Sequence, residues 1–168
     1  GAEQARQDEA REYYRALAGA DPSPALVKAA FTAVAKDLTG NHDADGNVLT
    51  RLFDNKQGWG RMQVAPVIAP QQAVQYIDQS EIFDATGDSW SQTFTADDPA
   101  QPIRIMLTWT DAPGHGLGGS TPAWNNDLDL RVTADGQTFL GNVLEDTGWS
   151  QTGGVADPMN NTEAVFLQ

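Results

Sequence analysis

Apolar residues recur at helical spacing in the first part of the chain. Ser23 and Pro24 suit the cap and the first position of a helix, and Gly40 is placed to end it. Between them, six apolar residues keep to helical spacing: Leu26, Val27, Ala30, Phe31, Val34 and Leu38. An earlier stretch, from Glu3 to Leu17, contains no breaker and is rich in good helix formers. The pattern predicts two helices.

Short β-prone runs, separated by clusters of Gly, Pro, Asn and Asp, follow in the rest of the chain. They are Ser89 to Ala96, Ile103 to Thr110, Asp127 to Val132, Thr138 to Leu140, and Glu163 to Leu167. In the third run the residues alternate, so that Leu128, Leu130 and Val132 share one face and two carboxylates share the other. Residues 134–137, Ala-Asp-Gly-Gln, predict a hairpin turn. Strands of this length and spacing favour an antiparallel β-sandwich or jelly roll.

The predicted fold class is therefore mainly β, an antiparallel β-sandwich or jelly roll preceded by two helices. We expect a boundary at Pro66, in a stretch with two prolines, which divides the chain into residues 1–65 and 66–168. The first part carries 8 basic and 9 acidic residues, and the second carries 2 and 14. Before the boundary, Trp59 stands between Gly58 and Gly60, which predicts a close backbone approach beside a packed indole.

Composition narrows the classes of partner. The 168 residues carry a net charge of −13, which repels nucleic-acid phosphates and anionic membrane surfaces, so we expect no nucleic-acid partner. The longest apolar stretch, Ala25 to Ala35, is far shorter than the roughly 20 residues of a membrane span. No cysteine is present, which excludes disulfides and thiolate metal sites. With 40% hydrophobic residues the chain should fold, and its acidity favours a secreted or cell-envelope location.

Five segments, taken in order, resemble the C-terminal part of a subtilisin-like serine protease, a subtilase with a β-jelly-roll (P-domain-like) domain after its catalytic domain. They are Pro22–Ala30, Gln57–Met62, Leu107–Gly114, Asn125–Leu130 and Asn160–Glu163. The resemblance implies that residues 1–65 are the tail of the catalytic domain and 66–168 most of the jelly roll, which in the family continues with at least one more strand. It also implies an upstream catalytic domain as partner and a polypeptide substrate.

The family's Gly-Thr-Ser-Met-Ala-like nucleophile motif does not occur in these 168 residues, so we expect the chain alone to be inactive. A triad needs an imidazole base, and only His42 and His115 are available. His115 lies near Ser120, but a flexible glycine loop is favoured there over a catalytic role. His42 is interpreted as a turn residue beside Asp43. The pair Asp127 and Asp129 fits an acid–base role in a glycosidase only weakly.

Oxygen-bearing side chains gather at the predicted strand ends of the second part. Calcium takes six to eight such ligands, and crowded carboxylates repel one another without a cation. The sequence therefore predicts a calcium site, and the resemblance agrees, because related jelly rolls bind calcium. The candidate ligands are Asp111, Asn125, Asn126, Asp127, Asp129, Asn160, Asn161 and Glu163. The alternative is that these residues only form turns and keep strand edges soluble.

Two further readings stay open. Trp90, Trp124 and Trp149 lie near predicted loops, and their exposure would favour a non-enzymatic module that binds glycan or protein. A pseudo-protease scaffold, whose upstream triad is lost, is the other.

Residues 43–47, Asp-Ala-Asp-Gly-Asn, suggest a calcium loop of the EF-hand type. Such a loop requires Gly at its sixth position and Glu at its twelfth, where this chain has Val48 and Asp54, so a turn is favoured.

Overall fold

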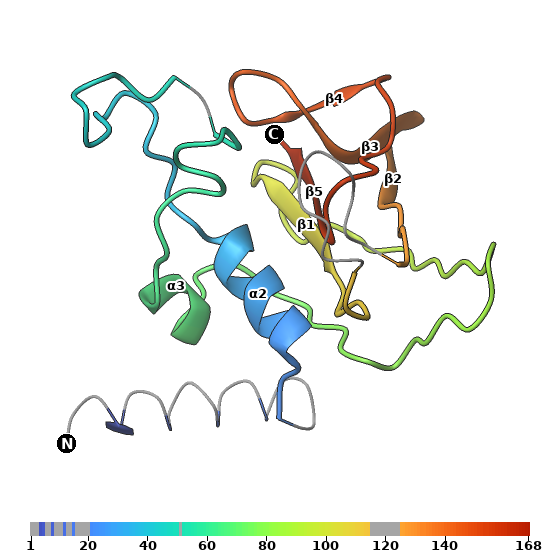
Figure 1. Cartoon of the computed structure of the whole chain (residues 1–168). Helices are drawn as coiled ribbons and strands as arrows, with labels where there is room; N and C mark the ends of the chain where they lie inside the picture. The colour runs from blue at the N-terminus through green and yellow to red at the C-terminus, as the bar shows by residue number, and fades with distance from the viewer. Residues whose placement is uncertain are drawn as a thin grey trace.

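The computed structural model describes residues 4, 5, 8, 12, 15, 21–50, 52–114 and 125–168. They contain the helices α2 (Pro24–Ala33) and α3 (Ala65–Ile68) and the strands β1 (Ile103–Thr108), β2 (Arg131–Ala134), β3 (Gln137–Leu144), β4 (Ser150–Thr152) and β5 (Thr162–Leu167) (Figure 1). Strand β1 pairs with β5, and β2, β3 and β4 form a second sheet, with every pairing antiparallel. The predicted class is confirmed at the level of a mainly β structure with antiparallel sheets and two helices, which are small. The described residues form no closed barrel.

Helix α2 begins as its sequence predicts. The Ser23 side chain accepts a hydrogen bond from the Leu26 backbone N–H at 3.0 Å, and Pro24 stands in the first turn. The helix ends at Ala33, so the predicted end at Gly40 is wrong. Beyond it, the Lys36 backbone exchanges two 2.8 Å hydrogen bonds with Arg61, a tertiary pairing that an extended helix could not make. Of the earlier predicted helix, the five described residues (4, 5, 8, 12 and 15) are helical and exposed.

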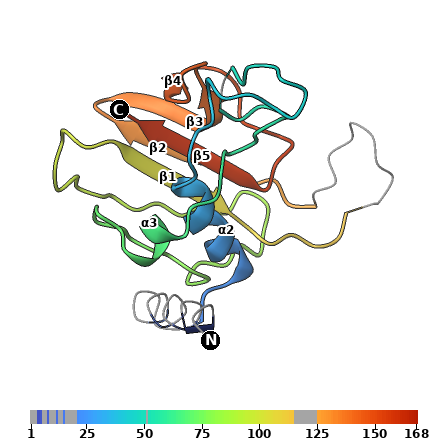
Figure 2. The ribbon, with the colours of Figure 1, turned by 90° about the vertical axis from the view of Figure 1, so that its left-hand side faces the viewer.

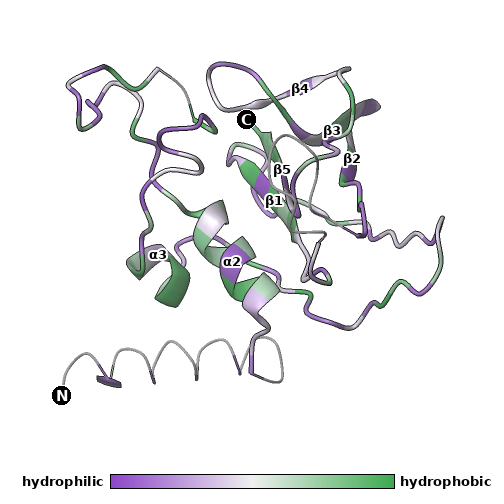
Figure 3. Ribbon diagram, in the orientation of Figure 1, coloured by the Kyte–Doolittle hydropathy of each residue, from purple (hydrophilic) through white to green (hydrophobic). Residues whose placement is uncertain are grey.

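Helix α3 lies at the predicted boundary and packs back on the first part. Val67, which is 1% exposed, contacts the buried Ala30 of α2. Phe31, Val34 and Tyr76 surround this pair. Figure 3 shows α3 as an almost wholly apolar turn. The residues that follow position 65 therefore complete the core around α2.

Strand β5 is the most buried element and lies between β1 and β3 (Figure 2). It pairs with β1 along its whole length, and the fully buried Ala164 lies opposite Met106. Side chains satisfy its other edge. The Asn142 side chain accepts a hydrogen bond from Ala164 N at 3.0 Å and donates one to the Thr162 carbonyl at 2.9 Å, while Ser150 Oγ accepts from Phe166 N at 2.9 Å. These side chains join the two sheets.

The β predictions are confirmed at three places. Runs Ile103–Thr110 and Glu163–Leu167 correspond to β1 and β5. The hairpin turn lies between β2 and β3, with φ of 49° at Asp135 and 73° at Gly136, the left-handed values of a tight hairpin. Strand β3 extends beyond the predicted 138–140, and β4 was not predicted.

Two strand predictions are wrong wholly or in part. Ser89–Ala96 lies in a run between α3 and β1 that has no regular structure, where no described strand pairs with it and Phe94 is 50% exposed. Asp127–Val132 becomes β2 only from Arg131. The predicted alternation still holds there, because Leu128, Leu130 and Val132 are half-buried while the intervening residues are exposed.

Specific contacts attach the helical part to the β1–β5 sheet. Arg104 of β1 donates a 2.8 Å hydrogen bond to the Ala33 carbonyl at the end of α2, and its guanidinium lies 5.0 Å from the Phe166 ring centroid. Trp59 also packs edge-on against Phe166, at 6.3 Å between centroids. The close approach predicted beside Trp59 is confirmed, since Gly60 has φ of 98° and an added Cβ would collide with the Lys36 carbonyl.

Across the described residues, no helix is long and apolar enough to cross a membrane.

Candidate functional site

The predicted ligand residues divide into three neighbouring groups rather than one. The first is a loop network around Asp111, which follows β1. Its carboxylate accepts hydrogen bonds from the backbone N–H of Asn125 at 2.6 Å and of Asn126 at 3.1 Å, and from the Asn126 side chain at 2.7 Å. The Ala112 N–H adds a fourth at 2.8 Å. These bonds lower the pKa of Asp111, led by the one from the Asn126 backbone.

Trp109 fixes the same loop from the other side. Its indole N–H donates to the Asn126 carbonyl at 3.1 Å. The Asn125 side chain in turn donates to the carbonyls of Ala112 and Pro113, at 2.9 and 3.0 Å. The polar groups of Asp111, Asn125 and Asn126 therefore form hydrogen bonds with one another and with the backbone. In this arrangement the three side chains stabilise the loop.

The second group centres on Glu163, which is 0% exposed within β5. Its Oε2 accepts a hydrogen bond from Leu130 N at 2.6 Å, and its Oε1 is buried with no partner among the described residues. The side chain lies against Gly141 of β3, where an added Cβ would come within 2.7 Å of the Glu163 Cβ. Glycine is required at position 141 because this carboxyl group fills the space of a side chain.

The pKa of Glu163 is raised to about 7, first by burial and then by the negative charges of Asp129, Asp157 and Asp127, against the opposing hydrogen bond from Leu130 N. The pKa of Asp127 is also raised, first by burial and then by the repulsion of Asp129 and Asp157. A buried carboxyl group with one unsatisfied oxygen therefore lies within the field of three aspartates. Ionisation of Glu163 in this place is costly unless a cation is present.

Asp127 and Asp129, which precede β2 and belong to this group, are exposed. Within the ranges that the structure describes, no three His, Cys, Asp or Glu side chains converge closely enough to hold a metal ion. The carboxylates therefore share an electrostatic field without forming a closed coordination shell of their own.

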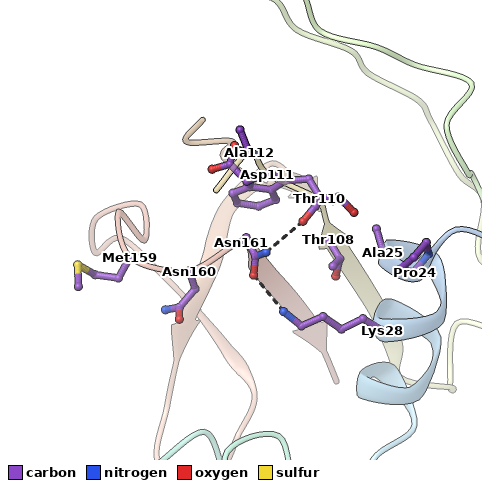
Figure 4. A pocket seen from close by; sticks show the side chains of 11 residues that line it. Pro24, Ala25, Lys28, Thr108, Thr110, Asp111, Ala112, Met159, Asn160 and Asn161 are labelled. Atoms are coloured by element: carbon purple, nitrogen blue, oxygen red, sulfur yellow. Dashed lines mark hydrogen bonds between the residues drawn. The ribbon is translucent and has the colours of Figure 1, made fainter. Parts of the chain in front are cut away.

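The third group contains Asn160 and Asn161, which precede β5 and line a cavity of about 460 Å³ between α2 and the end of β1. Asn161 joins three elements: it accepts a hydrogen bond from Lys28 Nζ at 3.0 Å and donates one to the Trp109 carbonyl at 3.1 Å (Figure 4). Partial burial lowers the pKa of Lys28. Asn160 donates to Asp157 at 2.7 Å.

Sequence reasoning missed three residues of this region. Lys28 was assigned only to a helix, and nothing in its surroundings predicted a partner 133 positions away. Asn142 has φ of 60° and joins the sheets, and Asp157 accepts from Asn142 at 2.5 Å, from Asn160, and from Met159 N at 2.8 Å. Only Asp157, in an Asp-Pro-Met-Asn-Asn run rich in turn formers, had a visible signal.

The remaining candidates behave as turns or lie elsewhere. His42 is exposed in a bridge with Val48, and Asp43 accepts from the backbone N–H of Asp45 and Asn47, so the turn predicted for residues 43–47 is confirmed. His115, Ser120 and Trp124 lie outside the described residues. Trp90 is 41% exposed, whereas Trp149 is half-buried.

Comparison of the chain with family models, with curated proteins and with solved structures gave no match.

Proposed function

We propose that this chain is the C-terminal part of a secreted or cell-envelope subtilisin-like serine endopeptidase. In this proposal residues 1–65 complete the catalytic domain, and residues 66–168 form most of a jelly roll. The acyl-transfer residues stand upstream and act on a polypeptide substrate. This part of the chain has no catalytic role and stabilises the enzyme.

One observation carries the proposal: long-range polar contacts join the segments that resemble subtilase motifs to one another. The late-helix motif provides Lys28, which bonds Asn161 of the last motif. That residue bonds Trp109 of the first jelly-roll motif, and Trp109 bonds Asn126 of the second. Glu163, which also belongs to the last motif, accepts a hydrogen bond through its carboxylate from the backbone N–H of Leu130 in the second jelly-roll motif. Contacts that link all of these segments are expected if the segments belong to one fold.

The test uses the complete reading frame that encodes the chain. We expect its product to hydrolyse casein and to be labelled by a serine-directed phosphonate at a serine in a Gly-Thr-Ser motif upstream of residue 1. The 168-residue chain should show neither activity nor label. A complete product that carries the motif yet leaves casein intact would refute the proposal, and loss of the motif itself would support a pseudo-protease scaffold instead.

We further propose calcium as the cation of the Glu163 group. The chemistry of the donors fits, because Glu163 has a buried oxygen that no described residue bonds, and Asp127 and Asp129 contribute to its field. Glu163 would bind the ion through this oxygen, and the charges of Asp127 and Asp129 would attract it. The positive charge of the ion would remove the cost of burying an ionised carboxylate. Asp111, Asn125 and Asn126 are weaker candidates, since their polar groups already bond one another.

Thermal melting of the chain tests the calcium site. A ligand that binds only the folded state adds about 2.7 kcal/mol at a hundred times its dissociation constant, which raises the midpoint by several degrees. We expect this rise with calcium but not with magnesium, and its loss in Glu163→Gln. Asp135→Asn, at the exposed hairpin turn, is the matched control and should keep the rise. Equal melts in calcium and in chelator would refute the site.

A further inference from the structure

A long excursion of the chain lies between α3 and β1. Two hydrogen bonds hold its base: the Gln72 side chain donates to the Gln101 side chain at 2.8 Å, and the Asp78 carboxylate accepts from Ser23 N at 2.8 Å. Beyond this base, every residue from position 79 to position 104 is exposed, and Figure 1 shows the light-green segment extending to one side of the sheets. Loops longer than about 12–15 residues without regular structure are uncommon in compact domains, and they are usually functional loops or linkers.

Residues 89–96 of this excursion, here called the open run, continue without a turn or bend. No hydrogen bond, ion pair or ring contact joins the open run to the rest of the described chain. The backbone N–H and C=O groups along both of its edges are therefore accessible to a partner. Extended peptides bind other proteins through such main-chain groups, with pockets for alternate side chains, and endopeptidases bind their substrates in this form. The open run thus offers a peptide substrate without any unfolding.

The side chains of the open run select the class of endopeptidase. Trp90 is 41% exposed and Phe94 is 50% exposed, so both rings can enter the hydrophobic specificity pocket of a chymotrypsin-like enzyme. No lysine or arginine lies between Arg61 and Arg104. A trypsin-like enzyme, whose pocket requires a basic side chain, therefore has no site in the excursion.

Contacts between the parts before and after the open run do not pass through it. Arg104 of β1 donates a 2.8 Å hydrogen bond to the Ala33 carbonyl of α2, and Trp59 packs edge-on against Phe166 of β5. Helix α2 also packs along β1. Each of these pairs has one member on either side of the open run. A chain cut there would keep these contacts, and its two products should remain associated.

We propose that the open run is a processing site, where an endopeptidase that accepts large aromatic residues cuts the native chain after Trp90 or Phe94. The cut consumes one water molecule, breaks one peptide bond, and leaves a new carboxylate on one product and a new amino group on the other. The two products stay assembled as a two-chain protein. The proposal does not depend on the proposed protease ancestry, because the chain is here the substrate.

The test compares the initial rates at which chymotrypsin cuts the native 168-residue chain and a synthetic peptide of residues 84–100, followed by mass spectrometry. The bonds after Trp90 and Phe94 should be cut in the chain within about tenfold of their rate in the peptide, because cleavage there requires no opening of the fold. The bond after Phe139 lies in the paired strand β3. It should be cut at least about a hundredfold more slowly in the chain than in a peptide of its own sequence.

Two variants separate accessibility from other causes. Gln92→Arg places a basic residue in the open run and should create a site that trypsin cuts rapidly. Thr138→Arg is the matched control, since position 138 is also exposed but pairs with Thr133 in the β2–β3 sheet, and it should resist trypsin. Asn142→Ala, which destabilises the fold, should speed the cut after Phe139 and leave the rate after Trp90 unchanged.

Assembly of the products is measured by size-exclusion chromatography of the cut chain. The two products should elute together in native buffer and separate in urea. Four results would each overturn the proposal: cleavage of the open run more than about tenfold slower than in the peptide, resistance of Gln92→Arg to trypsin, equal acceleration of both cuts by Asn142→Ala, and products that separate without urea.

Discussion

Replacing Glu163 with glutamine should make the protein more stable at alkaline pH and leave it nearly unchanged in acid. Glutamine keeps an oxygen that can accept from Leu130 N, and it cannot ionise. The pKa of Glu163 is raised from an ordinary 4.5 to about 7, so the folded state binds this proton more tightly than the unfolded state does. The stability that the proton contributes is complete below about pH 4.5 and is lost as the pH rises through about 7.

The magnitude follows from the same two pKa values. Their difference corresponds to about 3 kcal/mol at 1.36 kcal/mol per pKa unit. In a chelating buffer at pH 8.5, Glu163→Gln should therefore unfold with a free energy about 3 kcal/mol larger than the parent chain. At pH 4.5 the two proteins should agree closely, because both then carry a neutral group at position 163.

Urea unfolding between pH 4.5 and 8.5, followed by tryptophan fluorescence at fixed ionic strength, measures this difference. Glu81→Gln, which removes an exposed carboxylate of the segment before β1, is the matched control. A difference between Glu163→Gln and parent that stays constant across the pH range would refute the account of a costly buried carboxylate. Saturating calcium should abolish the advantage of the variant at pH 8.5, because the ion would stabilise the ionised parent.

Substitutions at three further positions test the contacts that hold the fold. Gly60→Ala should lower the free energy of unfolding by more than about 1 kcal/mol, measured by urea titration, because φ of 98° and the Lys36 carbonyl exclude a Cβ; an unchanged midpoint would contradict this geometry. Asn142→Ala should cost about 3 kcal/mol and speed amide exchange at Ala164, whose N–H would lose its acceptor; unaltered exchange would exclude the bridging role. Ser23→Ala should cost about 1 kcal/mol in a thermal melt through loss of the α2 cap, and Ser23→Asn, another good cap, should restore most of it.

Local sequence signals predicted those features that depend on neighbouring residues. The Ser23–Pro24 start of α2, the hairpin at Asp135–Gly136 and the close approach at Gly60 all rest on backbone preferences of a few residues. The same holds for the alternation around Leu128 to Val132, which the burial of these side chains reproduces.

Features set by distant residues could not be predicted in this way. The end of α2 depends on Lys36 pairing with Arg61, and the β-prone run Ser89–Ala96 fails to become a strand because no described strand lies beside it. At the candidate site, chemical type was visible but grouping was not. Eight oxygen-bearing residues were expected to share one site. The structure divides them between the loop network around Asp111, the group around the buried Glu163, and the cavity lined by Asn160 and Asn161.

The side chains that cover the inner edge of β5 also bear on solubility. A strand edge with free N–H and C=O groups can recruit a strand from another molecule, which begins edge-to-edge aggregation. Asn142 and Ser150 occupy those groups on β5 with side-chain atoms, so an incoming strand would find them already bonded. Asn142, whose backbone is in the left-handed conformation, thereby protects the most buried strand of the described chain from self-association, at the cost of one strained residue.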